Sequence, residues 1–230
     1  MGAPVDDVMA QLEAAGTEQN RKVYQRHGAK APLFGVSFTE QKKIAKGHKR
    51  DQKLADALWD TGNADARYLA AQIADPEGIS KTRLRAWAKG IDHYVLVELL
   101  AKNVTSKSPL AWELTLDWTR ARGEWAAALG WATLANLAMS DDGRPAREYE
   151  AYLKRIEEEI GGAANRVRHE MNGALIAIGT RSDGLARKAT AAAKRIGPVI
   201  VDHGETSCKT PDAVPYIAKA RAHRAAKTRK

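Results

Sequence analysis

Tyr94 and Glu98 are the residues whose types and spacing best suit chemistry in this sequence. They lie in the run IDHYVLVELLA, residues 91–101, which has the periodicity of a helix. A spacing of four residues puts an aromatic ring and a carboxylate on one helix face, where one ligand can meet both. Lys102 lies four residues beyond Glu98, so an ordinary surface ion pair is the simpler alternative explanation.

A second group of candidates surrounds Gly123. Trp118, Trp125, Arg120 and Arg122 lie within a few residues of this glycine, at a predicted turn between helices. Aromatic and arginine side chains at one turn can bind a nucleic acid by stacking and by phosphate contacts. Tryptophans that pack in the core are the alternative.

The segment VIVDHGETSCKTP, residues 199–211, crowds polar side chains around a glycine. His203 and Cys208 invite a nucleophile or zinc interpretation, but a zinc site needs three or four convergent ligands. A loop that docks onto helix ends is favoured, with Lys209 as a further phosphate contact.

Basic residues are concentrated in a few stretches. The chain has 37 lysines and arginines against 28 acidic residues, a net charge of +9. Residues 218–230 contain basic but no acidic side chains, which predicts a basic C-terminal tail. Local basic patches suit a phosphate-backbone partner, and solvated helix faces are the alternative. Further candidate phosphate contacts are Lys42, Lys43, Lys46, Arg166 and Arg168.

Several protein classes are excluded by composition. The 230 residues, 44% of them hydrophobic, suffice for one compact domain. No stretch approaches the roughly 18 apolar residues of a membrane helix, and the acidic start is unlike a secretory signal. A single cysteine, Cys208, rules out an internal disulfide and predicts a cytoplasmic protein, nucleoid-associated in a bacterium.

Helical periodicity recurs along the chain, and few stretches alternate apolar and polar residues as strands do. Asn63 and Thr39 are expected N-caps. The predicted helices are 5–15, 17–27, 39–49, 51–60, 63–74, 80–89, 91–105, 109–121, 124–139, 145–160, 163–180, 183–195 and 211–222.

Short helices with brief connections leave apolar faces that neighbouring helices must cover. We therefore expect an all-α fold of HEAT-like helical-hairpin repeats, stacked into a curved solenoid with a concave basic face. A compact helical globule is the alternative. Because no linker is visible, one domain is expected over 1–217, followed by a basic C-terminal tail over 218–230.

Stretches along residues 20–220 together resemble the DNA alkylation repair glycosylases, which are built from HEAT-like repeats. The run VDHGETSCKTP, residues 201–211, is similar to one in a divergent branch of that family. The stretches that carry the resemblance are Tyr24 with LFGVSFTEQKK (33–43), LADALW (54–59), RYLAAQ (67–72), Tyr94 with Glu98, KSP (107–109) and MNGAL (171–175).

The resemblance implies a DNA glycosylase that hydrolyses the N-glycosidic bond of N3- or N7-alkylated purines in duplex DNA, without a metal or cofactor. Tyr94 and Glu98 match the family's lesion-facing tryptophan and catalytic aspartate, and Asp92 is the alternative carboxylate. Aromatic groups attract the cationic purine, and a carboxylate stabilises the oxocarbenium sugar and orients water. Tyr24, Tyr94 and Trp125 are the expected cleft aromatics.

The expected partner is duplex DNA that carries alkylated bases. The protein is expected to be a monomer and not to associate with a membrane. A non-catalytic module is the alternative from another functional class. Such a module would bind nucleic acid through the basic patches or hold a protein in its groove.

Overall fold

The computed structural model describes residues 4–30, 32–140 and 142–228. Within these ranges the chain forms thirteen α-helices and two short 3-10 helices, with one isolated bridge between Gly16 and Val36 and no strand. The predicted all-α class is therefore confirmed. None of the helices in the described ranges has the length and apolar character that a membrane crossing needs. Arg229 and Lys230 of the predicted tail lie outside the described residues.

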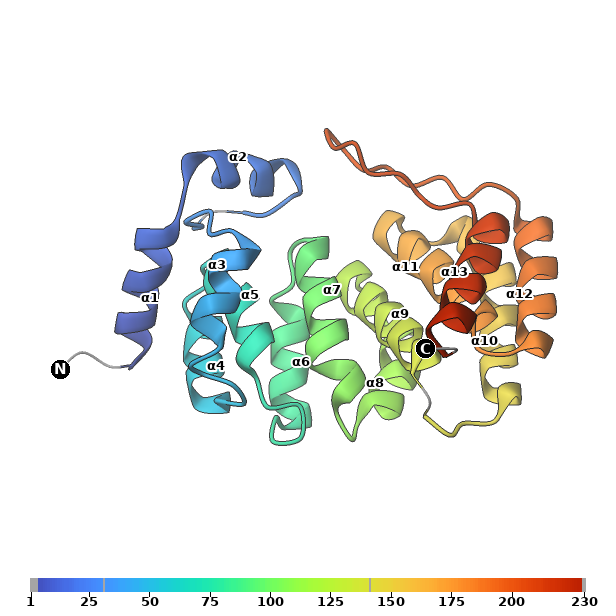
Figure 1. Ribbon diagram of the computed structural model, residues 1–230, viewed down its shortest axis with the longest axis horizontal. Helices are drawn as coiled ribbons and strands as arrows, with labels where there is room; N and C mark the ends of the chain where they lie inside the picture. The colour runs from blue at the N-terminus through green and yellow to red at the C-terminus, as the bar shows by residue number, and fades with distance from the viewer. Residues whose placement is uncertain (1–3, 31, 141, 229–230) are drawn as a thin grey trace. The chain divides into compact units, whose positions relative to one another are not determined.

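The chain divides into two compact units. Unit 1 extends to Ala111 and includes Gly204–Thr206, and unit 2 comprises Trp112–His203 and the residues from Ser207 onward. Figure 1 labels the helices of both units. The domain boundary expected at 217 stays a prediction. Residues 218–228 of the predicted tail are not an irregular extension, because they belong to the last helix.

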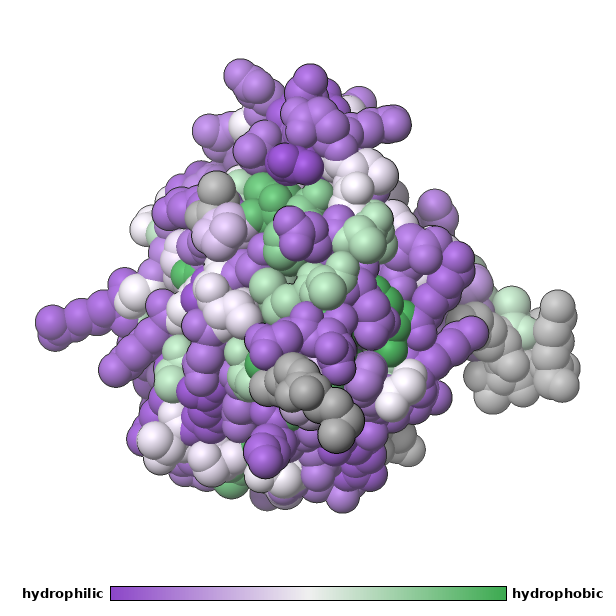
Figure 2. Space-filling view, turned by 90° about the vertical axis from the view of Figure 1, so that its left-hand side faces the viewer, coloured by the Kyte–Doolittle hydropathy of each residue, from purple (hydrophilic) through white to green (hydrophobic). Residues whose placement is uncertain are grey.

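Unit 1 has a core of aromatic and aliphatic side chains. The rings of Trp59 and Trp87 stack with centroids 4.5 Å apart, and both side chains are buried. Hydrophilic residues cover most of the face that Figure 2 shows, with apolar residues gathered in a small band. The helices are α1 (Pro4–Ala15), α2 (Glu18–Arg26), α3 (Phe38–Ala45), α4 (Gln52–Asp60), α5 (Ala64–Ile73), α6 (Lys81–Lys89), α7 (Tyr94–Asn103) and η1 (Thr105–Lys107).

Side-chain caps define where several of these helices begin. Thr17, Ser37 and Asn63 each accept a hydrogen bond from the backbone N–H three residues further on. The prediction of Asn63 as an N-cap is confirmed. Thr39 was the wrong choice, because Ser37 caps α3 and Thr39 lies inside the helix.

A buried carboxylate in α5 organises the segment before α3. Asp65 is fully buried, and its two oxygens accept hydrogen bonds from the backbone N–H groups of Phe34, Gly35 and Val36, at 2.7–2.9 Å. Gly35 has φ +82°, and a Cβ there would lie 2.4 Å from the carbonyl oxygen of Thr17. Glycine is therefore required where this segment crosses the start of α2.

Unit 2 is built around α9 and α11. Helix α9 buries residues on every side, among them Trp131, and Trp118 of the preceding helix is also buried. Trp118 thus follows the core alternative stated for the tryptophans near Gly123. The helices are α8 (Ala111–Trp118), α9 (Glu124–Met139), α10 (Ala146–Glu159), η2 (Ile160–Gly162), α11 (Asn165–Gly179), α12 (Asp183–Ile196) and α13 (Ala213–Thr228).

The substitution Asp65→Ala tests whether this carboxylate holds unit 1 together. It would leave three backbone N–H groups without an acceptor in a site from which water is excluded, and each such loss costs about 1–3 kcal/mol. We expect the free energy of unfolding to fall by about 3 kcal/mol or more in urea titrations followed by circular dichroism.

Asp7→Ala is the matched control, because Asp7 also lies in the first turn of a helix but is exposed. Its loss should stay below about 1 kcal/mol. Equal losses for the two variants would show that the buried carboxylate is not the anchor.

Candidate nucleic-acid interface

A cleft of about 920 Å³ lies within unit 1, bounded by α2, α3 and α7. Clefts of this size commonly hold small ligands or parts of larger ones. Aromatic, apolar and lysine side chains dominate its lining. The lining includes Val23, Tyr24, His27, Phe38, Lys42, Lys46, Lys49, Tyr94, Val95, Glu98, Leu99 and Lys102.

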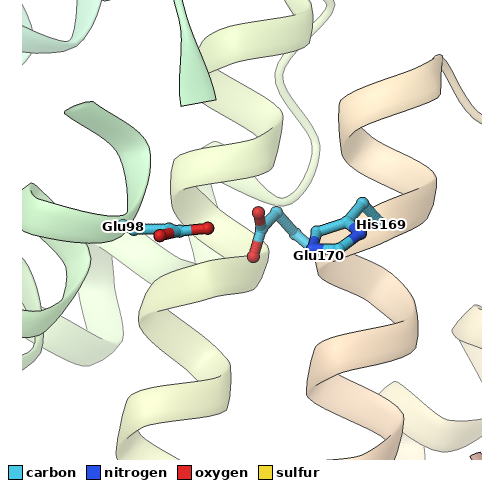
Figure 3. A group of neighbouring side chains, drawn as sticks. All are labelled: Glu98, His169 and Glu170. Carbon is cyan, nitrogen blue, oxygen red and sulfur yellow. The ribbon is translucent and has the colours of Figure 1, made fainter. Parts of the chain in front are cut away.

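Tyr94 and Glu98 line this cleft from α7, as their spacing predicts. Tyr94 is half-buried and its hydroxyl group is hydrogen-bonded to Nδ1 of His27, whose ring lies 5.8 Å from the tyrosine ring. Glu98 is exposed and projects from α7 (Figure 3). An aromatic ring and a carboxylate are therefore presented to the same space. Their catalytic roles stay a prediction.

Four lysines give the cleft its charge. Lys42, Lys46, Lys49 and Lys102 all line it, and none of them forms an ion pair with a described residue. Against them the lining contains one acidic side chain, that of Glu98. Lys43 differs from these lysines, because its Nζ lies 2.6 Å from Oε1 of Glu40 and it is not part of the lining. An excess of uncompensated positive charge in a cleft attracts anions.

Tyr24 lies in the cleft wall, as the resemblance implied. Its hydroxyl group donates a hydrogen bond to the carbonyl oxygen of Val36, at 2.7 Å. Burial, and then the negative charge of Asp65, raise the pKa of Tyr24 to about 12, so that its hydroxyl stays protonated at neutral pH. Its ring lies 5.9 Å from that of Phe38 and 5.8 Å from that of Tyr68.

Asp92, the alternative carboxylate, takes part in a different arrangement. Its Oδ1 lies 2.6 Å from Nδ1 of His93, and Nε2 of that histidine lies 2.5 Å from the hydroxyl group of buried Tyr68. Burial raises the pKa of Asp92, but the hydrogen bond and charge of His93 and the charges of Arg67 and Lys30 lower it by more. The net effect is a pKa below the ordinary value of an aspartate. Asp92 is not among the residues that line the cleft.

The other predicted contacts belong to unit 2. Trp125 is half-buried in the first turn of α9, and Lys209 is exposed. Arg120 and Arg122 are exposed and line a hollow of about 450 Å³ at the turn between α8 and α9. Arg166 is only 8% exposed. The role of Trp125 as a cleft aromatic and the roles of the other residues as phosphate contacts stay predictions.

Arg168 has a structural task that the sequence did not reveal. Its guanidinium donates hydrogen bonds to the carbonyl oxygens of Ile200 and Ala163, both at 2.9 Å. Asn165 adds two hydrogen bonds to the backbone of Asp202, at 2.7 and 2.8 Å. These contacts attach the segment after α12 to the start of α11. Periodicity cannot show such a contact, because the partners are more than 30 residues apart in sequence.

Two histidines lie beside this attachment. The rings of His169 on α11 and His203 meet edge to face, with centroids 5.4 Å apart. Burial, then the charge of Arg166 and that of His203, lower the pKa of His169 to about 4. With this lowered pKa, the imidazole of His169 is neutral at physiological pH. Figure 3 shows His169 on α11 next to Glu170.

Known proteins resemble this chain over nearly its whole length. One solved structure superimposes on this chain with a TM-score of 0.87 and 30% sequence identity, and the match covers 96% of this chain and 95% of the chain in that structure. That structure is described as "a new family of proteins related to the HEAT-like repeat DNA glycosylases with affinity for branched DNA structures". The uncharacterized proteins Lin0241 of Listeria innocua and Lmo0209 of Listeria monocytogenes are each 29% identical over 221 residues, covering 94% of this chain and 96% of theirs.

The fold is therefore that of the HEAT-like repeat proteins. Residues 8–217 match the DNA alkylation repair enzyme family, and the chain belongs to that family. The expected fold class and family are both confirmed.

Arg168→Ala should loosen the segment after α12 while leaving the helices in place. Because the variant loses both hydrogen bonds to carbonyl oxygens, amide hydrogens of residues 200–203 should exchange with solvent several-fold faster. Arg187→Ala is the control, since Arg187 is exposed on α12. Unchanged exchange in Arg168→Ala, measured by mass spectrometry, would refute the structural task given to this arginine.

Proposed function

We propose that this protein binds DNA in the unit 1 cleft, with a preference for branched DNA. The observation that carries the proposal is the set of four lysines that line the cleft without forming ion pairs to described residues. Nucleic acids are abundant polyanions that such a cluster attracts. Binding of their phosphate groups releases condensed counterions. The solved relative with affinity for branched DNA supports the same partner.

Double substitution of Lys42 and Lys46 by alanine tests the binding site. If both lysines contact phosphates, affinity for branched DNA should fall at low salt, and the slope of log K against log salt should decrease in magnitude by about 2. The measurement is fluorescence anisotropy of a labelled three-way junction at several salt concentrations.

Lys53→Ala with Lys89→Ala is the matched control, because both lysines are exposed in unit 1 but lie outside the cleft lining. It removes the same net charge. If both double variants change the slope equally, binding depends on the total charge and the cleft is not the site.

The finer proposal is that the cleft hydrolyses the N-glycosidic bond of N3- or N7-alkylated purines. Tyr94 would lie against the cationic base, and the carboxylate of Glu98 would stabilise the oxocarbenium sugar and orient water. Membership of the DNA alkylation repair enzyme family supports this reaction. Glu98 is favoured over Asp92 because Glu98 lines the cleft and Asp92 does not.

Glu98→Gln separates catalysis from binding. Glutamine keeps the shape of the side chain but loses the charge, so release of 7-methylguanine and 3-methyladenine from methylated duplex DNA should fall at least about 100-fold. Affinity for the same DNA should not decrease. Asp92→Asn is measured beside it, with circular dichroism to check folding.

Loss of release only in Asp92→Asn would move the catalytic carboxylate to that residue. A wild-type protein that binds DNA but releases neither base would refute the glycosylase proposal and leave the binding proposal standing.

A further inference from the structure

Phe38 is a large apolar side chain that the cleft leaves exposed. Phe38 is the first residue of α3, is 36% exposed as a residue, and belongs to the cleft lining. A solvent-facing aromatic ring beside lysines is a common feature of surfaces that bind unpaired nucleic acid bases.

The ring packs beside two other aromatic residues. Its centroid lies 5.9 Å from that of Tyr24 and 5.7 Å from that of Tyr68. Both tyrosine hydroxyl groups are hydrogen-bonded, to Val36 and to His93. The phenylalanine ring is therefore held on a rigid base, so that little conformational freedom is lost when a flat ligand stacks on it.

The cations follow the ring along the same helix face. Lys42 and Lys46 come four and eight residues after Phe38, at intervals of about 6 Å along a helix axis. Helix α7 contributes the apolar side chains of Val95 and Leu99 to the lining, besides Glu98 and Lys102. The cleft thus combines an aromatic ring, lysines that can bind phosphate, and apolar surface.

We propose that this cleft takes an unpaired nucleotide of DNA, with the base stacked on Phe38 and the phosphates along Lys42 and Lys46. In a duplex the faces of the bases are covered by their neighbours, and only the base edges are open in the grooves. An aromatic ring with apolar side chains in the same cleft fits the π-face that an unpaired base exposes. A branch in DNA interrupts stacking and supplies such bases. The inference rests on the proposed DNA binding and specifies the form of DNA that the cleft accepts.

The test compares a fully paired duplex with the same duplex carrying a short single-stranded gap with 2-aminopurine in it. Phe38→Leu keeps an apolar side chain but removes the π-face, so affinity for the gapped DNA should fall about tenfold while affinity for the duplex changes less than about twofold. Quenching of 2-aminopurine on binding should decrease with it. Phe38→Trp, which restores a π-face, should keep both the affinity and the quenching.

Leu116→Ala is the control for loss of an exposed apolar side chain, since Leu116 is 37% exposed on α8. It should leave both affinities unchanged. A Phe38→Leu variant that binds gapped and paired DNA as the wild type does, or loses both equally, would overturn the stacking proposal while the lysine cleft still binds DNA. Absence of binding to any probe by the wild type would instead reject the proposed function itself.

Discussion

The architecture of the cleft depends on one buried carboxylate. Asp65 on α5 accepts hydrogen bonds from three consecutive backbone N–H groups, at Phe34, Gly35 and Val36. The same short segment is bonded to the start of α2, since the carbonyl oxygen of Gly35 accepts from the backbone N–H of Thr17. Val36 then leads directly into the N-cap of α3. The Asp65 side chain therefore fixes α2 and α3, two of the helices that line the cleft, to α5.

The buried hydrogen bonds around Asp65 also explain why the cleft can present so much apolar and cationic surface. Tyr24 is held by the carbonyl oxygen of Val36, and Tyr68 is held by His93. These bonds use the polar groups of the aromatic side chains, so that their rings form a packed support for Phe38. The lysines repel one another when no anion is present, and a bound anion removes that repulsion. The cleft therefore favours a ligand that has a flat ring at one end and an anionic group at the other.

How far the sequence predicts this arrangement depends on the sequence separation of the partners. Tyr94 and Glu98 lie on one helix, and their spacing alone places them on a common face. The helix pattern and the Asn63 cap depend on local signals in the same way. Asp65 has partners about 30 residues away, and in the sequence it is only one more polar residue in a helix. Its role, and that of Phe38 in the cleft wall, follow from packing between helices, which periodicity does not contain.

The number of basic residues in the sequence does not show which of them can bind a ligand. That depends on which side chains already have partners within the protein. Arg83 lies 2.7 Å from carboxylate oxygens of both Asp56 and Asp60, and Arg168 is bonded to two carbonyl oxygens. Arginine suits such tasks because its planar guanidinium donates several hydrogen bonds in fixed directions. The cleft lysines have no such partners among the described residues. Their compact charge at the end of a flexible side chain can follow a phosphate backbone whose path changes at a branch. Arg83 and Arg168 therefore hold the fold, whereas the cleft lysines remain available to an anion.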